Sequence, residues 1–264
     1  MSATLKGYDN FDAHACAKRG VWLTIVPDTI IAPTAELTLG LLLGVMRRLR
    51  EGDSHVRSGD FAGWRPHLYG ASLEGSVVGI VGMGPLGQGV ARRLAGFDSN
   101  VLYSDLHRLD EDRGRDLGVS HVELGHLVGR SDAIVVTLPL TAKTRRIVDA
   151  AVLARMRPGA FLVNVGRGSV VDEEAVADSL EAGRLGGYAA DVFAMEDWAV
   201  PGRPSGIPER LLQHPRTLFS PHLGSAVDDV RRAMSLQAAR QVRQVLVEGR
   251  RPDHPVNEPV FTRS

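Results

Sequence analysis

The chain has 264 residues, of which 44% are hydrophobic and 23% charged, as in a globular protein with one large domain or two small ones. Its 31 basic and 31 acidic residues balance, so charge gives no general case for a nucleic-acid or membrane partner. The single cysteine, Cys16, excludes an intrachain disulfide, and the sequence lacks a signal peptide and any apolar run near the ~20 residues of a membrane span. We therefore expect a cytoplasmic protein.

The first segment of the chain is too short to bury a core of its own. Residues 12–19 are compatible with a short helix, and residues 21–26 have the composition of a strand that ends at Pro27. Thr34 is a good N-cap for a helix over residues 35–50, which is apolar on most of its faces. We expect this helix to be buried between layers of the fold or between subunits.

A glycine-rich turn gives the strongest local signal in the sequence. Residues 82–87 read Gly-Met-Gly-Pro-Leu-Gly, and they lie between an expected buried strand at 76–81 and an expected helix at 86–97. A second short strand follows at 101–104. A strand, a glycine-rich turn, a helix and a strand in this order form the βαβ unit of a dinucleotide-binding site.

Each residue of this unit has an expected role. Gly82 permits the tight turn, Gly84 lets the backbone approach the pyrophosphate, and Gly87 allows the helix to pack closely on the strand. Asp105, at the end of the second strand, would bond the ribose hydroxyls and repel a 2′-phosphate. The sequence therefore predicts NAD as the cofactor.

Strands and helices continue to alternate after this unit. Strands are expected at 133–138, 160–165, 188–192 and 217–219, and helices at 122–129, 149–156, 173–182 and 226–247. Strands that alternate with helices predict an α/β fold with a doubly wound parallel sheet, the Rossmann architecture.

Three polar side chains are expected at the edge of this sheet where ligands bind, beyond the carboxyl ends of the strands. They are Arg167 after strand 160–165, Glu196 after strand 188–192, and His222 after strand 217–219. Each of the three also has a purely structural interpretation. Arg167 would be a surface or ion-pair residue, Glu196 a solvated carboxylate and His222 a turn residue. Together, a base, a carboxylate that orients it and a cation for an anionic substrate predict a dehydrogenase site.

Three motifs in this region resemble those of the D-isomer-specific 2-hydroxyacid dehydrogenases. They are Gly-Arg-Gly-Ser-Val-Val-Asp at 166–172, Asp-Val-Phe-Ala-Met-Glu at 191–196 and Pro-His-Leu-Gly at 221–224, in the family's order and spacing. The resemblance implies that Arg167 holds the substrate anion, His222 is the catalytic base and Glu196 orients it. It also implies no metal, and cofactor contacts from Pro85, Leu86, Pro139 and Asp191.

Within this family, residues 5–12, 20–24 and 186–199 resemble the phosphonate (phosphite) dehydrogenases, most specifically at 195–199. The resemblance implies NAD-dependent oxidation of phosphite to phosphate, with water activated by His222. It further assigns Lys6 and Arg231 as cations at the substrate, and Trp64 and Tyr69 as aromatic neighbours of phosphite.

The family also has a smaller, flavodoxin-like substrate domain built mainly from an N-terminal segment, and this chain starts at a position that matches the end of that segment. We therefore expect an NAD-binding domain at 33–221 and a remnant of the substrate domain at 1–32 and 222–264, with activity reduced by an open cleft. Two alternatives stay open: a D-2-hydroxyacid or glyoxylate/hydroxypyruvate reductase, and a truncated, non-catalytic NAD-binding oligomer. The apolar helix at 35–50 would suit the interface of a homodimer.

Overall fold

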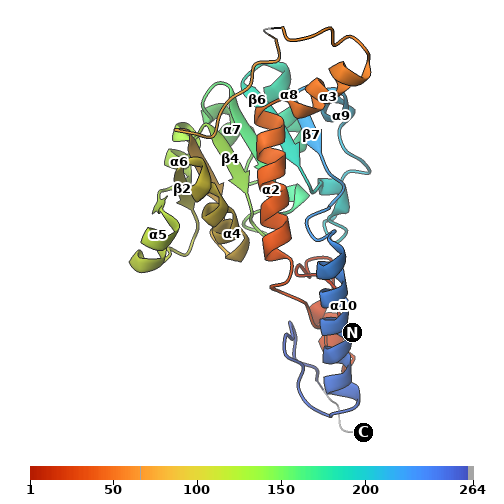
Figure 1. Cartoon of the computed structure of the whole chain (residues 1–264). Coiled ribbons are helices and arrows are strands. Elements are labelled where there is room, and N and C mark those ends of the chain that lie inside the picture. The colour runs from red at the N-terminus through yellow and green to blue at the C-terminus, as the bar shows by residue number, and fades with distance from the viewer. Residues whose placement is uncertain (66, 261–264) are drawn as a thin grey trace.

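The computed structural model describes residues 1–65 and 67–260, and within them seven parallel strands form one sheet in the order β3-β2-β1-β4-β5-β6-β7 (Figure 1). The strands are β1 Val77–Val81, β2 Asn100–Ser104, β3 Val119–His121, β4 Ala133–Val136, β5 Ala160–Asn164, β6 Leu185–Ala190 and β7 Thr217–Phe219. The strand order reverses between β1 and β4, which creates the crevice where such folds bind dinucleotides. The predicted α/β class and parallel sheet are confirmed.

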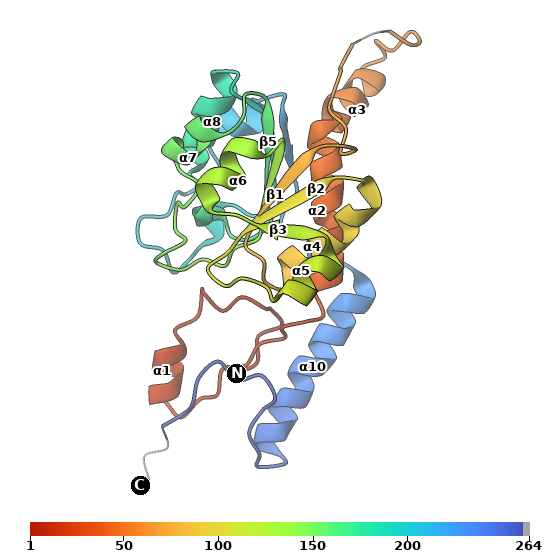
Figure 2. The ribbon, with the colours of Figure 1, turned by 90° about the vertical axis from the view of Figure 1, so that its left-hand side faces the viewer.

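Helices cover both faces of the sheet. The α-helices of the described residues, of which α1 and α10 lie away from the sheet (Figure 2), are α1 Ala13–Lys18, α2 Ile31–Met46, α3 Leu49–Arg57, α4 Pro85–Leu94, α5 Glu111–Leu117, α6 Leu124–Arg130, α7 Ala150–Arg155, α8 Glu173–Glu181, α9 Glu209–Gln213 and α10 Asp228–Leu246. One buried apolar cluster joins α2 and α4 to the sheet, and a second joins α6, α7 and α8 to its other face (Figure 2). The central strands are buried on both sides, which explains their near-continuous apolar sequences.

Helix α2 begins earlier than the sequence predicts. Thr34 lies inside it, where its hydroxyl group donates to the Ile30 carbonyl oxygen at 2.7 Å, rather than capping it. Pro33 is tolerated because the first turn of a helix has no backbone acceptor for its N–H groups. The helix ends at Met46, and α3 follows after a left-handed residue, Arg48 (φ 55°).

The two ends of the described chain meet beside α10, away from the sheet (Figure 2). Thr24 bridges Ser2 on one side and Pro255 on the other, so the expected strand at 21–26 is reduced to one residue with two isolated bridges. A small apolar cluster of Val26, Met234 and Ala238 holds this segment on α10. The described residues include no helix long and apolar enough to cross a membrane.

Sequence reasoning missed α5 and β3, although both carry signals. Asp110 caps α5 by accepting a hydrogen bond from the Arg113 N–H at 2.8 Å, and Gly118 ends it in the left-handed conformation (φ 64°). An Asp cap and a following glycine are ordinary helix boundaries. The short strand β3 then completes the edge of the sheet beside β2.

Candidate active site

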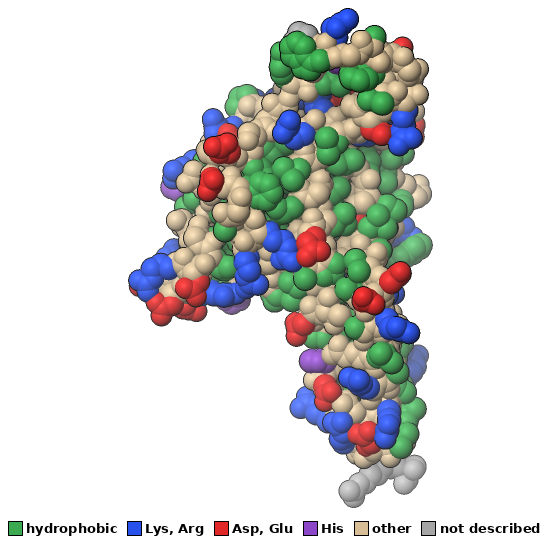
Figure 3. Space-filling model, viewed as in Figure 1, with side chains coloured by type: hydrophobic (Ala, Val, Ile, Leu, Met, Phe, Trp, Pro, Cys, Tyr) green, Lys and Arg blue, Asp and Glu red, His purple; other side chains and the backbone are tan. Residues whose placement is uncertain are grey.

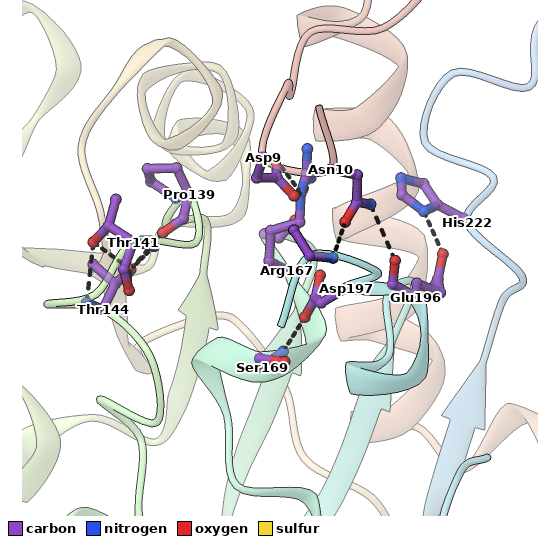
Figure 4. A network of polar contacts seen from close by, with 12 residues as sticks. Asp9, Asn10, Pro139, Thr141, Thr144, Arg167, Ser169, Glu196, Asp197 and His222 are labelled. Atoms are coloured by element: carbon purple, nitrogen blue, oxygen red, sulfur yellow. Dashed lines mark hydrogen bonds and ion pairs between the residues drawn. The ribbon is translucent and has the colours of Figure 1, made fainter. Parts of the chain in front are cut away.

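The structure brings Arg167, Glu196 and His222 together at the carboxyl edge of the sheet (Figure 4). Arg167 follows β5, Glu196 ends the 3-10 turn η3 (Ala194–Glu196) after β6, and His222 follows β7. Because β5, β6 and β7 are adjacent parallel strands, their carboxyl ends deliver the three side chains to the same place.

His222 and Glu196 form a hydrogen-bonded pair. The Nδ1 atom of His222 lies 2.7 Å from Oε2 of Glu196, and the imidazole is half exposed. The hydrogen bond to Glu196 raises the pKa of His222 above its ordinary value, against the opposing effects of burial and of Arg167. The imidazolium form is therefore favoured, and Nε2, on the other side of the ring, can exchange a proton with a substrate.

The backbone of His222 is held in the left-handed region (φ 56°), which is uncommon for a residue with a side chain. Asp191 holds the loop that carries His222. The family resemblance predicts that Asp191 contacts the cofactor. It is 2% exposed, and its carboxylate accepts hydrogen bonds from Ser220 Oγ, Leu223 N and Gly224 N at 2.5–2.9 Å. Asp191 thus positions the histidine loop in this structure, and its contact with the cofactor stays a prediction.

Arg167 is paired with Asp9, a residue to which sequence reasoning gave no role. Its Nε atom donates to both carboxylate oxygens of Asp9 at 3.1 Å, and its Nη1 atom donates to the Gly166 carbonyl oxygen at 2.8 Å. The other N–H groups of Nη1 and Nη2 are available for an anionic substrate. Gly7 packs directly on the guanidinium group, because a Cβ atom at this position would overlap Nη2.

The neighbouring Asn10 ties the N-terminal segment to the turn that carries the catalytic carboxylate. Its Nδ2 atom donates to the Glu196 carbonyl oxygen at 3.1 Å, and its Oδ1 atom accepts from the Ala199 N–H at 3.1 Å (Figure 4). On the other side of the same turn, Asp197 Oδ2 accepts from the Ser169 N–H at 2.7 Å. The segments that carry Arg167 and Glu196 are thus linked through Asp197.

The glycine-rich turn has the geometry that a dinucleotide requires. Gly82 has φ 100°, and a Cβ atom at Gly87 would overlap the Gly82 carbonyl oxygen, so helix α4 begins in direct contact with the turn. A Cβ atom at Gly84, the N-cap of α4, would meet no atom within 4 Å, so space is open in front of the helix N-terminus. Pro85 and Leu86 form the first turn of α4.

Asp105 lies next to this turn, at the end of β2. Its Oδ2 atom accepts a hydrogen bond from the Met83 N–H at 2.6 Å, and its Oδ1 atom accepts from the His107 N–H at 2.9 Å. On the far side of the crevice, the Pro139 carbonyl oxygen accepts a hydrogen bond from the Thr144 hydroxyl group at 2.7 Å (Figure 4). Both predicted cofactor contacts therefore lie on ordered loops at the edge where the strand order reverses.

The two further predicted cations lie on the N-terminal segment and on α10. Lys6 adjoins Gly7, and burial lowers its pKa below the ordinary value, partly offset by the charge of Asp28. Arg231, in the first turns of α10, donates to the Thr4 carbonyl oxygen at 3.3 Å. Lys6 thus belongs to the N-terminal segment, Arg231 links α10 to that segment, and their contact with the substrate stays a prediction.

Trp64 and Tyr69 lie outside this cluster of side chains within the chain, and their place beside the substrate stays a prediction. They are 80% and 74% exposed, and they line a cavity of about 490 Å³ with Arg47, beyond the end of α2. Helix α2 begins near the histidine loop, where Thr34 donates to the Gly224 carbonyl oxygen, and then runs for 16 residues. At 1.5 Å per residue it carries the chain roughly 24 Å away from that loop.

Comparison with known families identifies the chain. The sequence model described as the NAD binding domain of D-isomer specific 2-hydroxyacid dehydrogenases matches residues 39–224. The chain belongs to this family. The cofactor of the 2-hydroxyacid dehydrogenase is thus NAD, as the glycine-rich turn predicts.

The relatives correct the expected reaction. A glyoxylate reductase of Thermococcus litoralis is 35% identical over 98% of this chain and 76% of its own length, and a glycerate dehydrogenase of Hyphomicrobium methylovorum is 37% identical over 88% and 70%. A solved glyoxylate/hydroxypyruvate reductase of Sinorhizobium meliloti, in complex with NADP and malonate, matches all of this chain and 79% of its own at 32% identity and a TM-score of 0.86. The predicted oxidation of phosphite is therefore wrong.

Proposed function

We propose that this chain reduces a small 2-oxo acid, glyoxylate or hydroxypyruvate, with NADH, and catalyses the reverse oxidation of the 2-hydroxy acid. The observation that carries the proposal is the His222–Glu196 pair beside the guanidinium group of Arg167, at the open edge of an NAD-binding sheet. The names of the relatives support the same substrate class.

The residues divide the chemistry as follows. Arg167 binds the substrate carboxylate through its free N–H groups, and its planar fork suits two oxygen atoms. The cofactor supplies the hydride. The imidazolium of His222 gives its Nε2 proton to the carbonyl oxygen as that oxygen gains negative charge, and Glu196 orients the ring and stabilises the proton on Nδ1. In the reverse direction, neutral His222 accepts the hydroxyl proton.

This assignment predicts opposite pH dependences for the two directions. Since the pKa of His222 is raised by Glu196, the protonated form persists toward neutral pH, and reduction is expected to slow as pH rises through that pKa. Oxidation of the hydroxy acid is expected to accelerate over the same interval. Initial rates in both directions across pH test this. Glu196→Gln removes the main cause of the shift and should move both profiles to lower pH, and unmoved profiles would contradict the assignment.

The direct test of the proposal is NADH oxidation by the purified chain with glyoxylate and with hydroxypyruvate, using phosphite with NAD⁺ as a control. Turnover of either oxo acid, with none of phosphite, is the expected result. If NADH binds but neither acid is turned over, the chain is instead a non-catalytic NAD-binding protein.

Asp105 provides a prediction for cofactor choice. Replacing Asp105 by alanine together with Leu106→Arg should raise the ratio of kcat/KM for NADPH to that for NADH by about tenfold or more, or ~1.4 kcal/mol. Leu106 is 85% exposed, so the arginine can be placed without disturbing the core. Because Asp105 also accepts the Met83 N–H, the double variant should bind NADH more weakly. Asp105→Asn is the matched control, and an unchanged ratio in the double variant would exclude Asp105 as the ribose ligand.

We also propose that the chain has two parts. Residues 33–221 form the cofactor-binding unit, and residues 1–32 and 222–264 form the remnant of a substrate domain. Residues 261–264 lie outside the described residues. The homodimer is likewise a proposal. We define the arm as residues 47–65 and 67–72, in which the apolar side chains of Leu49, Val56, Phe61 and Trp64 are exposed. Hydrophobic side chains gather at the end of the molecule where the arm lies (Figure 3). An apolar surface of this kind supports self-association, which light scattering of the chain and of Phe61→Asp would test.

A further inference from the structure

A buried carboxyl group lies behind the active site without a full set of partners. Glu173, the first residue of α8, is 5% exposed, whereas carboxylates are seldom buried unless they are paired. Its Oε1 atom accepts a hydrogen bond from the Ala194 N–H at 2.8 Å. Its Oε2 atom is buried with no hydrogen-bond partner. A buried polar atom without a partner is costly, so its presence requires an explanation.

The hydrogen bond from Ala194 connects Glu173 to the catalytic pair. Ala194 begins the turn η3, and Glu196 ends it. Glu196 uses one carboxylate oxygen to accept the Phe193 N–H at 2.8 Å and the other to contact His222 at 2.7 Å. The position of the Glu196 carboxylate therefore depends on the conformation of a turn that Glu173 holds at its first residue.

This turn has little room to adjust. A Cβ atom at Gly168 would overlap the carbonyl group of Phe193, so the segment after Arg167 packs directly on the backbone of the turn. Asp197 links the same two segments through the Ser169 N–H. A displacement at Ala194 would consequently be transmitted to Glu196.

The surroundings of Glu173 favour its neutral form. Burial, together with the negative charges of Asp197, Glu196 and Glu174, raises the pKa of Glu173 to about 7, against the opposing effect of the Ala194 N–H. The other titratable group packed nearby is Tyr188, whose pKa is raised by burial and by Glu173, so it stays a neutral phenol. A protonated Glu173 would add no third negative charge beside Glu196 and Asp197.

We propose that Glu173 is a positioning residue: its buried carboxyl group holds the turn Ala194–Glu196 so that Glu196 stays hydrogen-bonded to His222. The role in catalysis rests on the proposed reductase activity, but the effect on His222 does not. Loss of the proton from Glu173 places a third negative charge beside Asp197 and Glu196 in a buried position, which lowers the stability of the folded chain.

Three variants separate the possibilities. Glu173→Ala removes the acceptor for Ala194, Glu173→Gln keeps an acceptor and stays neutral at every pH, and Glu174→Ala changes the next residue, which is paired with Arg210 on the surface. We expect kcat for glyoxylate to fall roughly ten- to hundredfold in Glu173→Ala with KM little changed, since small displacements of catalytic groups have effects of this size. Glu173→Gln and Glu174→Ala should keep kcat near that of the parent at pH 6.

Two readouts do not require turnover. Titration of His222 by NMR, assigned by comparison with His222→Asn, should show its pKa falling toward the ordinary value in Glu173→Ala and staying raised in Glu173→Gln. Stability gives the second readout. In the folded chain Glu173 keeps its proton where the unfolded chain has lost it, so the parent should lose stability relative to Glu173→Gln as pH rises from 4.5 to about 7, with no further loss above.

These outcomes separate a failure of the positioning role of Glu173 from a failure of the proposed reductase reaction. An unchanged His222 pKa in Glu173→Ala, or an equal fall of kcat in Glu173→Ala and Glu174→Ala, would overturn the positioning role. If Glu173→Ala does not fold, the pH dependences of His222 ionisation and of stability in Glu173→Gln remain decisive. If the chain does not turn over glyoxylate but the pKa of His222 falls in Glu173→Ala as expected, the proposed reaction is rejected and the positioning role stands.

Discussion

Replacing His222 by asparagine is expected to lower kcat for glyoxylate reduction by about a hundred- to ten-thousandfold, the usual contribution of a general acid. Asparagine tolerates the left-handed backbone (φ 56°) that the loop imposes, and its amide group can still donate to Glu196. The variant therefore removes the transferable proton and changes little else. The measurement is kcat under saturating substrate, beside NADH affinity by fluorescence titration.

The control for this prediction is the binding of the cofactor. NADH affinity should be nearly unchanged, because the glycine-rich turn and Asp105 lie on the β1–α4–β2 unit and not on the histidine loop. His222→Ala should lose activity to a similar extent, with the added strain of a methyl-bearing residue in the left-handed region. If NADH affinity and thermal stability collapse together with activity in both variants, His222 is a structural residue.

Replacing Arg167 by alanine is expected to lower kcat/KM for glyoxylate by roughly a hundred- to thousandfold. Hydrogen bonds to charged groups contribute about 1.5–3 kcal/mol each, and each 1.4 kcal/mol is tenfold. Most of the effect should appear in KM, because the substrate carboxylate is bound in both ground and transition states. Arg167→Lys keeps the charge but loses the planar fork, so we expect an intermediate loss. Steady-state kinetics with glyoxylate measure all of these.

The ion pair with Asp9 complicates this prediction and also provides its control. Removing Arg167 leaves the Asp9 carboxylate, whose side chain is 18% exposed, without its cation. Asp9→Asn in the Arg167→Ala background restores a neutral surface there. If the double variant recovers the lost kcat/KM, the effect of Arg167→Ala comes from the unpaired Asp9, and Arg167 does not bind substrate.

Local signals were sufficient to predict the parts of the fold that depend on short stretches of sequence. The glycine-rich turn with its flanking strands is one of these, because the positive φ of Gly82 and the close contact at Gly87 demand glycine. Arg167, Glu196 and His222 were placed at one edge because parallel strands share their carboxyl ends. The boundaries were less predictable: α2 starts at Ile31 because tertiary contacts of Thr34 override its preference for capping.

Features that join distant segments could not be derived from spacing. Asp9 and Arg167 are 158 residues apart, and neither neighbourhood indicates the other. The resemblance, and not spacing, predicts Trp64 and Tyr69 beside the substrate, and the length of α2 separates them from the histidine loop of the same chain. Glu173 looks like an ordinary first-turn acidic residue, and only its burial beside the turn η3 reveals a further contact.

The left-handed backbone of His222 also creates a trade-off between catalytic activity and thermal stability. A residue with a side chain in this conformation costs about 1–3 kcal/mol, which the surrounding hydrogen bonds of Asp191 must offset. Glycine or asparagine at position 222 would relieve that strain, so selection for heat resistance alone would favour variants that have lost the proton donor. A stabilisation campaign on this protein should therefore hold position 222 constant and search for gains elsewhere.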